Sequence, residues 1–107
     1  NHLQFDQTCK KLYMVQSLAK LPVTPHCANW SMVTLFTMHL LRAIPNAGKY
    51  LEFSIEGPDY YPWQDGLFVQ SPYGIEDGHA CVTDAPGWGV EISPEWLARS
   101  SYQMSEV

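Results

Sequence analysis

One strand–helix–strand pattern limits what this chain can fold into more than any other feature. The short apolar run at residues 21–25 ends at its second proline, because proline is poorly tolerated inside a central strand. Apolar residues then recur at helical spacing over residues 30–44, and residues 50–53 form a second short strand-like run. Two strands joined by a helix predict a β-α-β unit, and such units build parallel sheets.

Local signals set the ends of the expected helices. Asn29 is the expected N-cap of the helix at 30–44, and the turn residues at 45–48 end it. An earlier helix is expected at residues 7–20, preceded by the end of a strand at residues 3–5. The later helix carries a wide apolar stripe, formed by Met32, Val33, Leu35, Phe36, Leu40 and Ile44.

The second half of the chain is rich in turns. Residues 56–66 predict an irregular loop, residues 67–69 an extended segment, and residues 73–82 a hairpin with Asp-Gly at its turn. Ser93 is expected to cap a short helix that has Pro94 in its first turn. The chain is therefore expected to combine an α/β half with an extended tail.

The composition excludes several classes of protein. The 107 residues carry a net charge of −5, so the chain lacks the basic face of a nucleic-acid binder. A hydrophobic content of 46% argues against disorder, yet no run approaches the roughly 18 apolar residues of a membrane span. Three cysteines without a C-x-x-C pair, together with the lack of a signal-peptide pattern, predict reduced thiols in a cytoplasmic protein.

Two polar residues stand at the ends of the expected strands. His26 follows the first strand, and Glu52 lies at the end of the second. Functional groups gather at the C-terminal ends of parallel strands, so one interpretation is that both side chains face one cavity. Spacing alone favours the other interpretation, in which His26 caps the following helix and Glu52 pairs with a lysine.

The remaining candidates for chemistry carry less weight. His39 lies inside an apolar helix and is expected to be structural, and His79 is expected at the surface beside the hairpin turn. His79 and Cys81 are too few for a structural zinc site, which needs about four ligands at recognisable spacing.

Three motifs in order carry a resemblance to a known family. They are Val23-Thr24-Pro25-His26, the stretch 39–47 that leads to Tyr50-Leu51-Glu52, and the Pro- and Gly-containing stretch 84–92. They resemble the seventh strand, the following helix with the eighth strand, and the closing segment of the enolase superfamily, mandelate racemase-like branch. The resemblance extends from about residue 7 onward.

This resemblance implies a fold that the chain cannot complete alone. The family joins an α+β capping domain to a modified (β/α)₈ barrel, and a barrel needs about 250 residues. The chain would then be a C-terminal fragment of the barrel in the α/β class. Residues 1–66 would supply the last βα units, and residues 67–107 would form a strap, with the hairpin and a short helix, toward the capping domain.

The resemblance also implies a chemistry, the abstraction of a proton α to a carboxylate with Mg²⁺ stabilising the enediolate. His26 matches the general base, or the general acid in dehydration. Glu52 matches the carboxyl group that hydrogen-bonds the substrate carboxylate, and Asp6 is a candidate partner of His26. The metal ligands and a second base, a lysine, belong to earlier strands of the family, so no metal ligand is expected in this chain.

The implied substrate is a hydroxy or sugar acid, with dehydration expected ahead of racemisation or epimerisation. The chain alone is expected to be inactive, and complete family members are expected to be homo-oligomers. The alternative is a small non-catalytic interaction module, or a truncated or pseudogene product. The module would use the aromatic residues of the tail, which are otherwise expected to pack on the absent capping domain: Tyr60, Tyr61, Trp63, Trp88 and Trp96.

Overall fold

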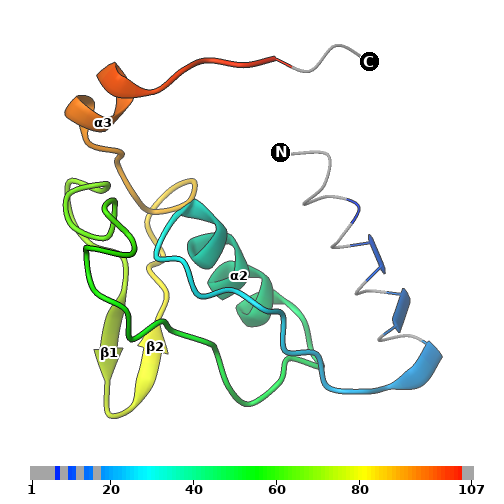
Figure 1. Ribbon diagram of the computed structural model, residues 1–107. Helices are drawn as coiled ribbons and strands as arrows, with labels where there is room; N and C mark the ends of the chain where they lie inside the picture. Colours follow the sequence, from blue (N-terminus) through cyan, green and yellow to red (C-terminus); the bar gives the residue numbers. More distant parts are fainter. Residues whose placement is uncertain (1–6, 8–9, 12–13, 16–17, 105–107) are drawn as a thin grey trace.

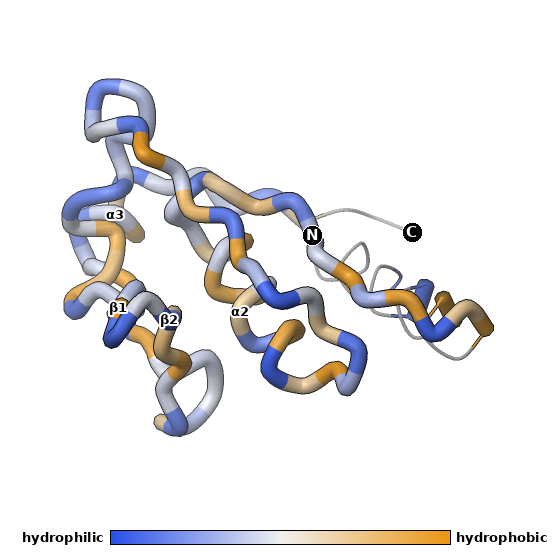
Figure 2. Tube along the Cα trace, turned by 90° about the horizontal axis from the view of Figure 1, so that it is seen from below, coloured by the Kyte–Doolittle hydropathy of each residue, from blue (hydrophilic) through white to orange (hydrophobic). Residues whose placement is uncertain are grey.

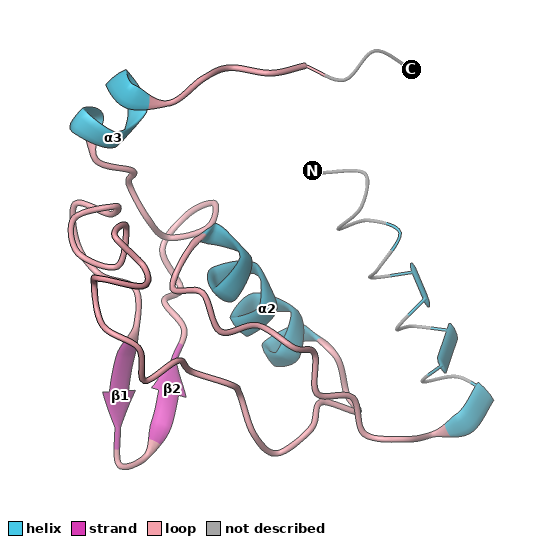
Figure 3. Ribbon diagram, viewed as in Figure 1, coloured by secondary structure: helices cyan, strands magenta, loops and turns pink. Residues whose placement is uncertain are grey.

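The computed structural model describes residues 7, 10–11, 14–15 and 18–104 (Figure 1). One longer helix lies beside a two-stranded hairpin, and much of the rest is loop (Figure 3). The named elements, in chain order, are α2 (Met32–Ala43), β1 (Gly74–Glu76), β2 (His79–Cys81) and α3 (Pro94–Arg99). Within residues 7–19, every described position is helical, which agrees with the helix expected there. The strand expected at residues 3–5 lies outside the described residues.

Helix α2 confirms the helix expected at 30–44 but begins two residues later. Ser31 is its N-cap, and the Ser31 hydroxyl accepts a hydrogen bond from the backbone N–H of Val33 at 3.2 Å. The prediction of Asn29 as the cap was wrong, because Trp30 takes a left-handed conformation (φ 56°) that keeps residue 30 out of the helix. The Asn29 side chain instead accepts from the Ser31 N–H and hydroxyl and from the Thr34 hydroxyl.

The end of α2 follows directly from the sequence. Proline disfavours the helical conformation in the residue before it, and Ile44 before Pro45 is extended, with φ −90° and ψ 134°. The Ile44 N–H still donates to the Leu40 carbonyl at 3.0 Å and closes the last turn. The stop expected at residues 45–48 is therefore confirmed.

The small core lies on one side of α2. Its members among the described residues come from the helix, the segment before it and the tail: Cys27, Thr34, Leu35, Thr37, Met38 and Phe68. The expected apolar stripe was only partly right, because Val33 is 50% exposed while the two threonines are buried. The most buried helix residues are Thr34, Leu35 and Met38, so tertiary packing and not apolar spacing selects the buried face.

The two segments that flank α2 meet in a single parallel bridge. Val23 pairs with Ala47, with Val23 N donating to Asn46 O at 2.9 Å and Gly48 N donating to Val23 O at 2.7 Å. A Cβ on Gly48 would overlap the Thr24 hydroxyl, so this close approach requires glycine. The parallel sense is the one expected of a β-α-β unit.

The second strand of that unit, expected at residues 50–53, was wrong as a strand. The described part of the chain has no ladder there, and the bridge forms earlier, at Ala47. Tyr50 is 71% exposed. An extended segment becomes a strand only when a neighbour supplies hydrogen bonds, and no described residue takes that place beside residues 50–53.

The hairpin is confirmed in position and turn. Strands β1 and β2 pair antiparallel with Ile75 opposite Ala80, and the turn residues Asp77 and Gly78 both have positive φ (48° and 76°). Two positive φ values define the type I′ turn that Asp-Gly favours. The extended segment expected at 67–69 is also present, because Phe68 forms an antiparallel bridge with Ile92.

Helix α3 begins at Pro94 as the sequence indicates. Proline suits the first helical position because the backbone N–H that it lacks would have no partner within the helix. Ser93 occupies the cap position, but its side chain makes no capping hydrogen bond, so that part of the prediction was wrong. The backbone N–H groups of Trp96 and Leu97 donate to the Ser93 carbonyl instead.

The chain is open for its size. It exposes 8237 Å² of surface, whereas a folded monomer of this mass exposes about 6,100 Å². The radius of gyration is 15.1 Å, against about 13 Å for a compact domain of this length. Both views place the N-terminal helical segment away from α2 (Figures 1 and 2), and its apolar Met14 and Leu18 are exposed. Among the described helices, none is long and apolar enough to span a membrane.

Candidate active site

The structure brings His26 and Glu52 together. The imidazole Nδ1 lies 2.7 Å from Glu52 Oε2, across 26 positions of sequence. Both side chains are accessible, at 87% exposure for His26 and 46% for Glu52. The two side chains therefore meet as the strand-end interpretation requires, but neither lines the pocket of about 550 Å³ described below, so that pocket is not the shared cavity that it expected.

The parallel bridge explains how the backbone places this pair. His26 lies three residues after Val23, and Glu52 lies five residues after Ala47, its bridge partner. The Asn46 side chain strengthens the junction by donating from Nδ2 to the Leu21 carbonyl at 2.7 Å. Two segments that leave one parallel bridge run in the same direction, so their side chains arrive at the same end. We name residues 26–31 the His26 loop and residues 49–55 the Glu52 segment.

The contact defines what the imidazole can do. An ionised carboxylate only accepts hydrogen bonds, so His26 donates to an ionised Glu52 through its Nδ1–H. The Nε2 lone pair then remains available to accept a proton, in the tautomer that a general base requires. In that tautomer, Nε2 is the ring nitrogen left to accept a proton.

Asp6, the third predicted site residue, lies outside the described residues. In the described part, the imidazole Nδ1 is partnered by Glu52. The partner of Nδ1 among the described residues is thus Glu52, whereas the resemblance assigns Glu52 to the substrate carboxylate and Asp6 to His26.

A buried layer lies beneath the pair. Cys27, next to His26, is 3% exposed, and its burial raises the pKa of the thiol. The nearby Glu52 charge also raises this pKa, whereas hydrogen bonds with the Thr37 and Thr34 hydroxyls lower it. Burial, with a smaller contribution from Cys27, also raises the pKa of Tyr73 well above its usual range. Both groups therefore stay protonated at neutral pH, and the layer supports the site without adding a charge.

Aromatic side chains hold the His26 loop, and sequence reasoning missed two of them. Trp63 Nε1 donates to the Asn29 carbonyl and the Tyr73 hydroxyl to the Ser31 carbonyl, both at 2.6 Å. Trp30 Nε1 donates to the Ser54 carbonyl at 3.2 Å. Trp30 and Tyr73 were not singled out in the sequence; the available signal was an aromatic residue directly after a polar turn, which is too common to be specific.

The tail aromatics correct one expectation. Trp63 and Trp88 were expected to pack on an absent domain, but Trp63 binds the His26 loop and Trp88 packs on Phe36 at a centroid distance of 4.4 Å. The Trp96 ring packs under the Arg99 guanidinium, 4.6 Å from its centroid. Trp63 and Trp88 therefore make contacts within this chain, although Trp88 remains 38% exposed and Tyr60 66% exposed.

The other histidines have the structural surroundings that were expected. His39 Nε2 hydrogen-bonds the Trp88 carbonyl at 3.2 Å, and the two rings meet edge to face. His79 is exposed on β2, where Nδ1 hydrogen-bonds the Asp77 carbonyl at 2.9 Å. His79 also lines the pocket described below, together with Leu51 and Phe53.

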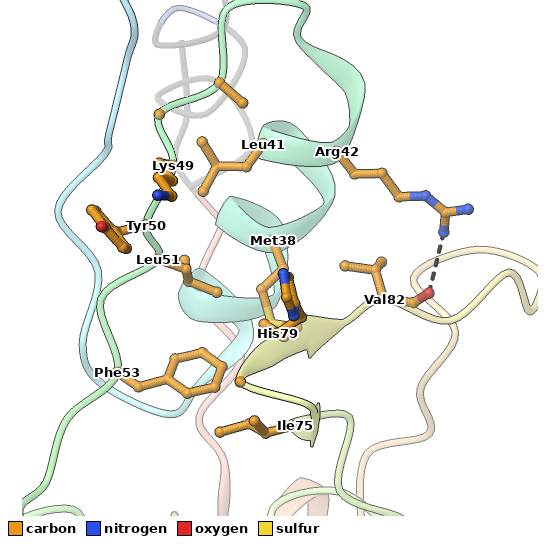
Figure 4. A pocket seen from close by; sticks show the side chains of 14 residues that line it. Met38, Leu41, Arg42, Lys49, Tyr50, Leu51, Phe53, Ile75, His79 and Val82 are labelled. Atoms are coloured by element: carbon orange, nitrogen blue, oxygen red, sulfur yellow. Dashed lines mark hydrogen bonds between the residues drawn. The ribbon is translucent and has the colours of Figure 1, made fainter.

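A pocket of about 550 Å³ lies between α2, the Glu52 segment and the hairpin (Figure 4). Leu51 and Phe53 point into it, together with Met38 from α2. Glu52 is not part of its lining and faces His26 instead. Alternate residues of an extended segment face opposite sides, so this segment separates an apolar groove from the polar pair.

No metal site can be assembled from the residues that the structure describes. They contain no group of three or more His, Cys, Asp or Glu side chains that could hold a metal ion. The described residues alone therefore do not fit a resident Mg²⁺.

The parallel bridge and the polar pair at its end define a piece of an α/β enzyme-like fold. The sequence profile of the family described as enolase C-terminal domain-like matches residues 7–96. The chain therefore belongs to the enolase superfamily, within its mandelate racemase-like group. No curated protein matches the sequence.

One similar solved structure is the crystal structure of a putative racemase from Roseobacter denitrificans. It is 81% identical in sequence, and the superposition has a TM-score of 0.79. The match covers 92% of this chain and 28% of that chain. This chain thus spans about a quarter of the length of that protein and corresponds to a partial barrel.

Proposed function

We propose that this chain supplies the proton-transfer side of an enzyme that removes the proton α to the carboxylate of a hydroxy acid. The observation that carries the proposal is the His26–Glu52 pair, 2.7 Å apart at the end of two parallel-bridged segments. The superfamily membership supports the role of His26, because the resemblance assigns that position to proton transfer. The resemblance assigns Glu52 to the substrate carboxylate, and the role that this proposal gives Glu52 rests on the contact alone.

His26 is the proposed base. Its Nε2 takes the α proton while the C–H electron pair moves into the carboxylate as an enediolate, and Glu52 holds the imidazole through Nδ1. Imidazole gains and loses protons near neutral pH, so the same atom can return the proton in a later step. The enediolate needs charge stabilisation, which this proposal assigns to residues outside the described part of the chain.

The fate of the enediolate decides the reaction type. In dehydration, protonated His26 gives its proton to the departing β-hydroxyl, and water is lost. In racemisation, a second group delivers a proton to the opposite face of the same carbon. The resemblance predicted dehydration first, whereas the name of the Roseobacter denitrificans relative favours racemisation, so product analysis must separate the two.

The complete protein in this proposal is this sequence together with the rest of the barrel and a capping domain. Superfamily members generally use Mg²⁺, and we place its ligands outside the described residues, as the resemblance implies. A homo-oligomer in the cytoplasm is proposed on the same basis. The open surface of this chain is the feature that supports a larger assembly.

The test is the exchange of the α proton with solvent. The complete protein is incubated in D₂O with a panel of aldonates, aldarates and simpler 2-hydroxy acids, and NMR follows both the loss of the α-proton signal and the products. His26→Asn should lower the exchange rate by at least about a thousandfold, within the range typical of general bases.

His79→Asn is the matched control, because His79 is an exposed histidine on the hairpin and away from the pair. It should exchange at the wild-type rate. The 107-residue chain alone should show no exchange. Unchanged exchange in the His26→Asn variant, with the fold intact by circular dichroism, would remove His26 as the base.

A further inference from the structure

Trp30 spans the two segments that carry the pair. It lies four residues after His26, and its indole Nε1 donates to the Ser54 carbonyl, two residues after Glu52, at 3.2 Å. The His26–Glu52 contact joins the same two segments at 2.7 Å. The indole hydrogen bond and the catalytic contact therefore close one ring of backbone and side chains.

The pair cannot hold its own geometry. The His26 side chain is 87% exposed, and that of Glu52 is 46% exposed. Exposed ion pairs contribute little free energy, since water competes for both partners. Their separation is therefore set mainly by the two backbone segments. Trp30 connects these segments a few residues further along the chain, at the Ser54 carbonyl.

Trp30 itself is held firmly. Its ring packs on Phe53 and Tyr73, with centroid distances of 4.6 and 5.1 Å. The residues on either side of it are fixed through their carbonyls, Asn29 by the Trp63 indole and Ser31 by the Tyr73 hydroxyl. The left-handed backbone of Trp30 (φ 56°) is rare for a residue with a Cβ, and such conformations persist only where surrounding contacts enforce them.

From this arrangement we infer that Trp30 is a positioning residue for the proton-transfer site, which sets the His26–Glu52 separation through its indole N–H. The inference rests on the proposed function. Trp30 belongs to neither the motif around His26 nor the motif around Glu52, so its positioning role is a separate assignment. The ring contributes packing, whereas the N–H contributes the cross-link, so the two can be separated by substitution.

The test uses Trp30→Phe in the complete protein, which keeps an aromatic ring but removes the donor and part of the ring area, a loss of area that the control below shares. Trp88→Phe is the matched control, since Trp88 packs on Phe36 and His39 on another part of α2. Trp30→Phe should lower kcat for α-proton exchange by about tenfold with KM within twofold, because small misplacements of reacting groups are costly in rate. Trp88→Phe should leave both constants near wild type.

Crystal structures of both variants make the test independent of activity. The account expects the Nδ1–Oε2 separation to exceed hydrogen-bond distance in Trp30→Phe and to stay near 2.7 Å in Trp88→Phe. Equal separations and equal kcat values in the two variants would overturn the inference. If His26→Asn retains full exchange while the separation still widens in Trp30→Phe, then the proposed function fails but the positioning role stands.

Discussion

The His26 loop and the Glu52 segment meet at the candidate site, yet they are held very differently. The loop has a buried cysteine at its start and two carbonyls, of Asn29 and Ser31, that accept short hydrogen bonds from the tail. The segment has no ladder within the described residues, and Tyr50 and Ile55 are 71% and 99% exposed. The backbone that carries His26 is therefore held by several contacts within the described residues, whereas the backbone that carries Glu52 is held by fewer.

This contrast shows that the two segments of the candidate site are held by different kinds of contact. The position of the proposed base, His26, depends on local aromatic contacts with its loop. The position of the carboxylate depends on the bridge at Ala47 and on the Trp30 indole, and further on whatever pairs with the open backbone of the segment. In a parallel barrel that partner is a neighbouring strand.

After the loss of His26 itself, the largest effect should come from removing the carboxylate on the weakly held side. Glu52→Gln in the complete protein should lower the α-proton exchange rate by about a hundredfold or more, because the amide can no longer stabilise the imidazolium that forms as His26 takes the proton. Glu76→Gln, an exposed glutamate in β1, is the control and should retain the wild-type rate. Equal rates in the two variants would mean that the Glu52 segment is only structural.

A smaller effect should come from the strongly held side. Tyr73→Phe removes the donor to the Ser31 carbonyl and should lower the free energy of unfolding by about 1 kcal/mol at neutral pH. Thermal unfolding measures this change. Tyr102→Phe, at an 88% exposed tyrosine, should change almost nothing. A larger loss in the control would contradict the assignment of Tyr73 to the support of the loop.

The same variant carries a pH signature. Burial raises the pKa of Tyr73 above its unfolded value, so its contribution is fully present below about pH 10 and declines as the pH rises further. Above about pH 10, the wild type should therefore lose stability that Tyr73→Phe does not lose. The stability difference between the two proteins should shrink across that range, and a constant difference would show that Tyr73 is not buried in the folded state.

Local signals predicted the elements that local physics determines. The Asp-Gly turn, the Pro45 stop and the Pro94 start each act within a few residues, and each was found in its expected place. The N-cap of α2 was misplaced because the conformation of Trp30 depends on contacts with residues 54 and 73, far along the chain. The strand at 50–53 failed for a related reason, since strand formation needs a neighbour.

The site was predictable in its residues and not in its geometry. The family resemblance selected His26 and Glu52, which strand-end topology alone offered only as the less favoured interpretation, and the structure places them in contact. The aromatic supports Trp30 and Tyr73 could not be selected, because nothing near them in the sequence distinguishes a support from an ordinary core residue. Their role depends on the distant carbonyls that they reach.

The most direct test of the account is a crystal structure of the complete protein with a 2-hydroxy acid bound. The account predicts the substrate α carbon about 3–3.5 Å from His26 Nε2, with Nδ1 bonded to Glu52, since reacting atoms in enzyme complexes approach to that range. A structure in which the imidazole turns away from the α carbon, or in which the substrate binds elsewhere, would contradict it.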